Sequence, residues 1–230
     1  CRGNAPAIIM AKESNLLETY FEWYLNELKE AGYIKSWHRE PFTIMVSEGI
    51  NHLRYDFKTK ENKIEEFQLF RKNEYTADYV IIWMPIAQEL FYNLLNSTIR
   101  IWCPFYAMID NKGEHYSVCD VKRPSGALAF GGNSTDYTFP IIQKMIYSKY
   151  NLFVTKVIPI PMVQKGKVKS GNTVSLFTTT FVPKRYHLTD AGLQGRVINY
   201  RKQTLREYVM YKTKEIDKIN ARMTTQQSLL

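Results

Sequence analysis

Three charged residues interrupt two stretches of sequence that otherwise favour β-strands. Asp78 lies in the stretch 75–83 (YTADYVIIW), and Asp120 and Lys122 lie in the stretch 116–122 (YSVCDVK). Side chains alternate between the two faces of a strand, so Asp120 and Lys122 are expected to project from the same face. Burying such charges costs free energy unless they are paired or hold a metal ion. Two carboxylates and an ammonium group that meet at one point would suit metal-dependent phosphodiester cleavage.

The segment that precedes these strands is expected to form a helix. Ser14 is a suitable N-cap for a helix over about residues 15–31, and Gly32 is a suitable C-cap. Apolar residues at helical spacing give this helix one stripe that faces the core. Most acids on a helix are simply solvated, but Glu18 flanks the apolar stripe in the first turn and is the helix acid of most interest.

The remaining segments read as strands and helices, which predicts an α/β (α+β) fold. Strands are expected over residues 33–46, 54–57, 67–71, 75–83, 100–109, 116–122, 152–160 and 173–182. Apolar spacing predicts helices over residues 86–96 and 136–150, and the basic tail after about residue 189 is compatible with a helix. The turn 110–113 predicts a hairpin, and the Gly- and Ser-rich stretch 124–135 predicts a loop that could form an adjustable rim of the site.

Composition and charge narrow the class of protein. The 230 residues are 45% hydrophobic and 14% aromatic, which is enough to bury a core and argues against a disordered chain. The formal charge of +9 suits a polyanionic partner, most simply nucleic acid, although a solvated basic surface without a partner stays open. Candidate phosphate contacts that would hold a duplex without reading its sequence are Lys165, Lys167, Lys169, Arg201 and Lys202.

The cysteines and the hydropathy pattern bear on the compartment. Cys1, Cys103 and Cys119 have no metal-type spacing and form an odd set, so we expect reduced thiols in a cytoplasmic setting. The four histidines are scattered, which argues against a zinc site. The sequence has no apolar run long enough to cross a membrane and no visible secretory pattern, so no membrane partner is expected.

The order of these features resembles the PD-(D/E)XK, or restriction-endonuclease-like, nuclease superfamily. That order is a helix with Glu18, a strand with Asp78, a strand with Asp120 and Lys122, a helix and a final strand. The chain is most similar to small phage and prophage nucleases that carry a Tyr-x-Ala-Asp-Phe strand and an Asp-Val-Lys-Gly strand. The stretches 31–34 (AGYI) and 39–41 (REP) also resemble the helix end and the strand entry of those proteins, and the resemblance covers about residues 14–158.

The resemblance implies a fold, a cofactor and roles for particular residues. It implies a restriction-endonuclease-like core, with a central mixed β-sheet flanked by helices, in a catalytic domain over residues 14–182 and a basic helical extension over 183–230. The implied ligands of Mg²⁺ or Mn²⁺ are the carboxylates of Asp78 and Asp120 and the carbonyl of Val121. Glu18 would complete the metal site or orient a water molecule. Lys122 would position that water, and Gln143 would hold the water or the scissile phosphate.

The sequence also departs from the family pattern. Arg123 and Pro124 replace the glycine that usually follows the lysine, and an insertion separates the two strands that carry the acids. Pro140 and Ile141 stand where the small phage nucleases often carry a helix lysine. The first two changes bear on the shape of the rim and on substrate access more than on the chemistry.

The function implied by the resemblance is a Mg²⁺-dependent endodeoxyribonuclease of phage or mobile-element DNA processing or recombination. One alternative is the DNA-end-cleaving subunit of a transposase complex, which would need a protein partner. A second is a non-catalytic DNA-binding protein built on a nuclease fold. An RNA substrate also stays open, because the site chemistry neither uses nor excludes a 2′-hydroxyl. A homodimer stays open as well, because oligomeric state depends on partners and groove shape.

Overall fold

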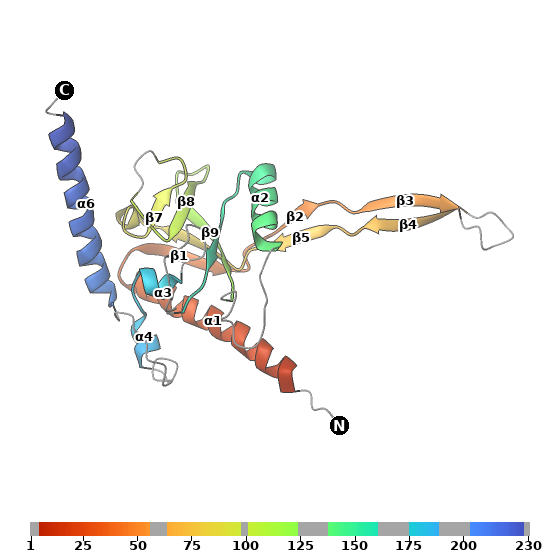
Figure 1. The fold of residues 1–230 in the computed structure, drawn as a ribbon, viewed down its shortest axis with the longest axis horizontal. Helices are drawn as coiled ribbons and strands as arrows, with labels where there is room; N and C mark the ends of the chain where they lie inside the picture. Colours follow the sequence, from red (N-terminus) through yellow and green to blue (C-terminus); the bar gives the residue numbers. More distant parts are fainter. Residues whose placement is uncertain are drawn as a thin grey trace.

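The fold is built around a six-stranded mixed β-sheet, as the computed structural model in Figure 1 shows. The structure describes residues 5–55, 64–97, 101–123, 138–160, 175–188 and 203–227. The sheet consists, in spatial order, of β1 (Ile34–Arg39), β6 (Tyr79–Trp83), β9 (His115–Val121), β8 (Phe105–Ile109) and β7 (Tyr92–Leu94), while β10 (Val154–Val157) also pairs with β9. The predicted mixed α+β architecture is therefore confirmed.

Strand β9 is the centre of the sheet. One of its edges pairs antiparallel with β6, whereas the other edge pairs first with β8 and then with β10. The first residues of β9 form an antiparallel hairpin with β8, and the residues from Val118 to Val121 pair in parallel with β10. The end of β9 that carries Asp120 is thus held on both edges, which fixes the position of its side chains.

Two helices cover opposite faces of this sheet. Helix α1 (Ala5–Glu30) packs against the face that carries Tyr79, Ile81 and Cys119. Helix α2 (Thr138–Tyr150) packs against the other face, which carries Val80 and Val118. Neighbouring residues of one strand therefore serve different cores, as the alternation of side chains along a strand requires.

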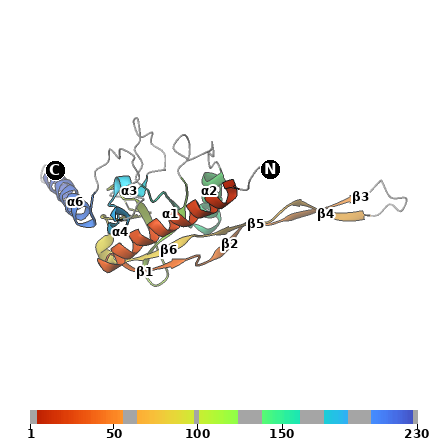
Figure 2. The same cartoon turned by 90° about the horizontal axis from the view of Figure 1, so that it is seen from below.

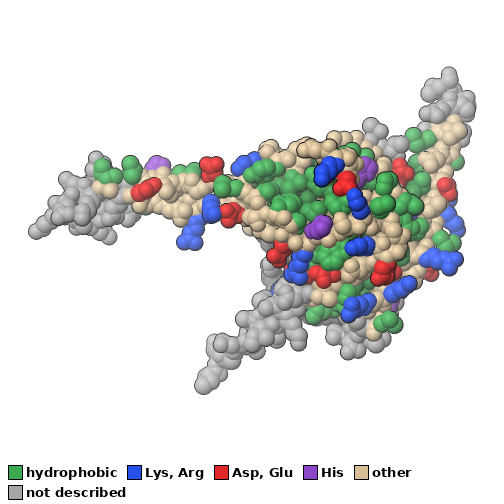
Figure 3. All heavy atoms as spheres, turned by 180° about the vertical axis from the view of Figure 1, so that it is seen from behind, with side chains coloured by type: hydrophobic (Ala, Val, Ile, Leu, Met, Phe, Trp, Pro, Cys, Tyr) green, Lys and Arg blue, Asp and Glu red, His purple; other side chains and the backbone are tan. Residues whose placement is uncertain are grey.

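A long two-stranded ribbon projects from one end of the sheet (Figures 1 and 2). Its inner part pairs β2 (Thr43–Ser47) with β5 (Asn73–Thr76), and its outer part pairs β3 (Ile50–Tyr55) with β4 (Ile64–Phe70). Exposed apolar and charged side chains both occur along it in the space-filling view of Figure 3. The base is tied to α2, because Lys149 Nζ and Tyr150 Oη both donate to the carbonyl of Met45, at 3.0 and 2.6 Å.

Helices also form the carboxyl-terminal part of the described chain. Short helices α3 (Leu176–Thr179) and α4 (Lys184–His187) precede the long helix α6 (Leu205–Gln227), which lies against the body by its first turns (Figure 1). Tyr208 of α6 is buried in the hydrophobic core between α1 and the sheet, the α1-side core, which also contains Tyr79, Ile81 and Cys119. Its hydroxyl donates to the carbonyl of Leu90. Among the described residues, no helix has the length and apolar character that crossing a bilayer requires.

The first helix is longer than the sequence predicts. It begins at Ala5 rather than after Ser14, so Ser14 lies inside the helix instead of capping it. The residues before Ser14 include Ala, Met, Lys and Glu, which are good helix formers, so the helix continues through a residue that could have started it. The predicted apolar stripe and the end of the helix are confirmed, since Phe21, Tyr24 and Leu28 are buried and Gly32 has a φ of 80°.

Two further predictions of secondary structure are wrong. The segment 86–96 is not a helix but a 3₁₀ turn, η1 (Pro85–Ala87), followed by β7, and the positive φ of 64° at Glu89 interrupts any helical backbone. The described part of 173–182 forms α3 rather than a strand. The hydroxyls of Thr179 and Thr180 donate to the carbonyl of Leu176, and these local bonds outweigh the strand preference of β-branched residues. The predicted loop 124–135 lies outside the described residues.

Candidate active site

The register of the central strands places Asp78 opposite Asp120. Tyr79 pairs with Cys119 and Val80 pairs with Val118 in antiparallel order, so the residue before Tyr79 faces the residue after Cys119. Asp120 shares the α2 face with Val118 because side chains alternate along a strand, and Asp78, at the bend before β6, lines the same cavity next to α2. The backbone N–H of Val121 donates to Asp78 Oδ2 at 2.7 Å and fixes that carboxylate beside the end of β9.

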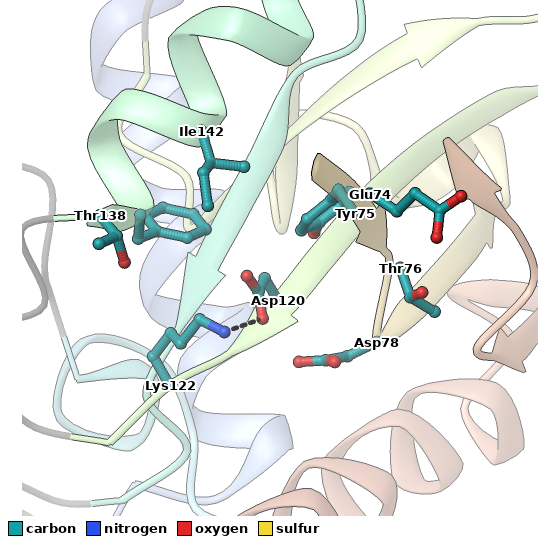
Figure 4. Close-up of a pocket in the computed structure, with 9 residues that line it drawn as sticks. Glu74, Tyr75, Thr76, Asp78, Asp120, Lys122, Thr138 and Ile142 are labelled. Carbon is teal, nitrogen blue, oxygen red and sulfur yellow. Dashed lines mark ion pairs between the residues drawn. The ribbon is translucent and has the colours of Figure 1, made fainter. Parts of the chain in front are cut away.

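Lys122 reaches the same point from the next position on this face. Its Nζ lies 2.7 Å from Asp120 Oδ1, and its backbone N–H donates to the carbonyl of Val157, which extends the strand geometry past the end of β9. The side chain of Asp120 is 3% exposed, whereas that of Lys122 is 36% exposed. An ammonium group that meets solvent thus contacts a buried carboxylate, as Figure 4 shows. The predicted common face of Asp120 and Lys122 is confirmed.

Burial and the proximity of the two acids change the protonation of Asp120. Burial raises its pKa to about 7, the carboxyl of Asp78 adds to that rise, and Lys122 opposes it. Asp120 Oδ1 is fully buried and, although Lys122 contacts it, accepts no hydrogen bond of regular geometry from the described residues. Two adjacent carboxyls with one ammonium carry an excess of negative charge when both ionise, so the pair favours a further cation.

The donor set fits a hard divalent cation. Asp78 and Asp120 offer carboxylate oxygens, and the N–H and C=O of one strand residue point toward the same edge, so the carbonyl of Val121 lies on the side of Asp78. Such oxygen ligands suit Mg²⁺ or Mn²⁺. Within the residues that the structure describes, however, no group of three or more His, Cys, Asp and Glu side chains is close enough to form a complete side-chain metal site.

The acids lie at a cavity of about 320 Å³. Its walls come from the strand β5, the two acid-bearing segments and the first turns of α2; the lining consists of Glu74, Tyr75, Thr76, Asp78, Asp120, Lys122, Thr138, Phe139 and Ile142. Lys156 of β10 pairs with Asp120 in parallel register, and its Nζ lies 5.4 Å from the ring centre of Phe139. The site therefore combines two acids with neighbouring basic residues.

Glu18 lies near the acids but is held by another partner. Its carboxylate forms an ion pair with Arg39, whose other terminal nitrogen lies 3.5 Å from Glu22 Oε1. Burial raises the pKa of Glu18, Arg39 opposes this, and the charge of Asp78 adds to it, which shows that Glu18 and Asp78 interact electrostatically. Glu18 does not line the cavity, so its contact with a metal ion stays a prediction.

The other predicted residues fall into two groups. Gln143 of α2 donates from Nε2 to the carbonyl of Val154, so its amide joins the helix to β10 and does not line the cavity. The predicted phosphate contacts all lie outside the described residues; they are Lys165, Lys167, Lys169, Arg201 and Lys202.

Tyr75 is a lining residue that the sequence reasoning does not single out. In one continuous strand over 75–83, Tyr75 and Asp78 would point to opposite faces. The chain instead bends between β5 and β6, and Ala77 and Asp78 are bonded to the other side of the ribbon through Phe42 and Glu40. The bend turns Tyr75 toward the acids, and the signal in the sequence is its place as the tyrosine of the Tyr-x-Ala-Asp pattern that ends at Asp78.

Comparisons with known proteins place the chain in no family. No family model matches it, and neither the curated proteins nor the solved structures contain a match. The resemblance to PD-(D/E)XK nucleases therefore stays a prediction, and the geometry around Asp78, Asp120 and Lys122 is what bears on the function.

Proposed function

We propose that the protein is a divalent-cation-dependent nuclease that hydrolyses phosphodiester bonds of DNA. The observation that carries this proposal is the convergence of Asp78, Asp120 and Lys122 at one cavity, from chain segments about forty residues apart. A buried acid in contact with a second acid is costly for folding, and such arrangements concentrate at functional sites. A purely structural sheet would place an apolar side chain at the position of Asp120.

The order of the elements supports the same proposal. Apart from the ribbon strands and the elements between β6 and β9, the order is α1, β1, β6 directly after Asp78, β9 with Asp120 near its end and Lys122 directly after it, α2 and β10. This is the order that the resemblance to PD-(D/E)XK nucleases implies. The insertion between the two acids forms β7 and β8, which extend the far edge of the sheet and leave the register of β6 and β9 intact.

The residues at the cavity have distinct roles in this proposal. Asp78, Asp120 and the carbonyl of Val121 would hold the cation. A bound Mg²⁺ or Mn²⁺ would polarise a phosphoryl oxygen and neutralise charge that develops in the transition state. Lys122, whose ammonium is partly exposed, would orient the attacking water and offset negative charge on the phosphate. The Val121 amide keeps the Asp78 carboxylate in place.

A plasmid assay with a matched variant tests the proposal. The wild-type chain is incubated with supercoiled plasmid, linear duplex, branched DNA, single strands and RNA, each with Mg²⁺, with Mn²⁺ and with EDTA. We expect nicking or linearisation of the circular plasmid that requires the cation and is lost in Asp120→Asn. Asp217→Asn is the control. Asp217 is exposed on α6, so this substitution removes the same charge at a position away from the site.

The outcomes separate the alternatives. Cation-dependent cleavage of circular DNA by the isolated chain would argue against a subunit that cuts only with a transposase partner. Equal cleavage by Asp120→Asn and the wild type would remove the site assignment. Tight DNA binding without cleavage of any substrate would favour a non-catalytic DNA-binding protein.

A further inference from the structure

The hydroxyl of Tyr75 is a buried donor at the cavity, and it has no hydrogen-bond partner among the residues that the structure describes. Tyr75 is 8% exposed, packs in the α2-side core and lines the cavity beside Asp78 and Asp120. Its hydroxyl oxygen is fully buried and makes no hydrogen bond within the part of the chain that the structure describes. Figure 4 shows the ring of Tyr75 beside Asp120, at the same cavity as Asp78 and Lys122. A buried hydroxyl without a partner is unusual and calls for an explanation.

Other buried tyrosines of this protein mostly satisfy their hydroxyls. Tyr79 donates to Glu22 at 3.0 Å, and Tyr208 donates to the carbonyl of Leu90 at 2.9 Å. Tyr24 also lacks a hydrogen bond of regular geometry, but its hydroxyl approaches Thr180 inside the α1-side core and does not line the cavity. Tyr75 therefore differs from these residues because it lines the cavity that holds Asp78 and Asp120.

The charges around Tyr75 keep it a donor. Burial raises its pKa above the ordinary value, and the charges of Asp120 and Asp78 raise it further, so the phenol stays protonated in neutral solution. A protonated phenol is a poor cation ligand and a good hydrogen-bond donor. Asp78 Oδ2 already accepts the Val121 amide and Asp120 Oδ1 is in contact with Lys122. Since the Tyr75 hydroxyl makes no hydrogen bond to either acid among the described residues, it can donate to an oxygen that a ligand brings into the cavity.

The surroundings favour a negatively charged oxygen. The first turn of α2 borders the same cavity through Thr138 and Phe139, and the amino end of a 13-residue helix favours negative charge. Lys122 lies at the cavity and Lys156 lies beside Phe139. Positive charge and the amino end of α2 therefore lie beside the two acids at this cavity, where a negatively charged ligand oxygen would be stabilised.

We propose that the Tyr75 hydroxyl donates a hydrogen bond to a non-bridging oxygen of the phosphate that is cleaved. This inference rests on the proposed nuclease function and adds a substrate-contacting residue to it. Asp78 and Asp120 would hold the cation, and Tyr75 would hold an oxygen of the phosphate at the same cavity. A donor fixed in place before the reaction stabilises charge in the transition state without reorganisation.

The substitution Tyr75→Phe tests this inference, because it removes one oxygen and keeps the ring in the core. We expect Tyr75→Phe to lower kcat on duplex DNA by about 10²-fold, with little change in KM. We also expect its melting temperature in EDTA to equal or exceed that of the wild type, because the lost hydroxyl has no hydrogen-bond partner among the described residues. Tyr24→Phe is the control: the same change in the α1-side core should leave kcat unchanged.

Comparing the wild type, Asp120→Asn and Tyr75→Phe distinguishes a failure of the proposed role of Tyr75 from a failure of the proposed nuclease function. If the wild type cleaves DNA, Asp120→Asn does not, and Tyr75→Phe cleaves like the wild type, the role of Tyr75 is refuted and the nuclease function stands. A Tyr75→Phe variant that melts well below the wild type in EDTA would also overturn it, since the hydroxyl would then have a structural partner. A wild type that cleaves no substrate, or an Asp120→Asn variant with full activity, would refute both.

Discussion

The two faces of the central sheet are formed by the same strands but bury different side chains. The α1 face buries a large aromatic core that includes Phe21, Tyr24 and Phe105. The α2 face has a smaller core, and its end opens into the cavity that holds Asp78 and Asp120. One step along β9 separates Cys119, which is buried on the first face, from Asp120, which is buried on the second. If the proposed function is correct, substitutions of these adjacent residues should affect stability and cleavage separately.

The largest expected contrast is between those two neighbours. Asp120→Asn should reduce cation-dependent DNA cleavage by roughly 10³-fold or more, because it removes a carboxylate that would hold the cation. Cys119→Ala should instead destabilise the fold by about 1–3 kcal/mol and leave kcat close to that of the wild type. Cleavage rates and chemical denaturation of both variants measure this contrast. A large loss of kcat in a folded Cys119→Ala would show that the two faces are coupled.

A second prediction compares aromatic residues from the two cores. Phe105 is fully buried among other rings, so Phe105→Ala should cost about 3–5 kcal/mol of unfolding free energy. Phe139 lies in the smaller core and already lines the cavity, so Phe139→Ala enlarges an existing space and should cost less. Urea titrations followed by fluorescence give both values. Equal losses of unfolding free energy in Phe105→Ala and Phe139→Ala would contradict the proposed difference between the α1 face and the α2 face.

A third prediction concerns pH and metal. The folded protein raises the pKa of Asp120 from 3.8 to about 7, so the native state binds a proton more tightly than the unfolded state. This stabilising term is fully present below pH 3.8 and is lost as the pH rises through about 7. In EDTA, the stability of the wild type relative to Asp120→Asn should therefore fall between these pH values.

Adding Mn²⁺ should reverse that loss. The cation binds the ionised pair, so it should raise the melting temperature of the wild type more at pH 8 than at pH 5. Asp120→Asn should show little response at either pH. Thermal scans with Mn²⁺ and with EDTA measure both effects, and a wild-type response that is the same at both pH values would speak against cation binding at Asp120.

The sequence predicts the arrangement of Asp120 and Lys122 better than the arrangement of the segments around them. Asp120 and Lys122 share a face because of strand alternation alone, and this is confirmed. The prediction of a helix over 86–96 is wrong because apolar spacing alone cannot distinguish a helix from a buried loop and strand. Residues of this segment form β7 instead, which pairs with β8. Tyr75 is missed because the bend between β5 and β6 depends on hydrogen bonds to Glu40 and Phe42, far away in the sequence.

The smallest expected effect tests whether α1 contributes to the chemistry at all. Glu18 interacts electrostatically with Asp78 but is paired with Arg39, and this pair is partly exposed, so its loss should change stability by less than about 1 kcal/mol. If Glu18 helps to bind or orient the cation, Glu18→Gln should lower cleavage by about tenfold, as losses of supporting residues at metal sites do. Glu22→Gln is the matched control one turn further along α1, where the amide oxygen can still accept the Tyr79 hydroxyl. Equal cleavage rates for Glu18→Gln, Glu22→Gln and the wild type would show that Glu18 does not contribute to cleavage.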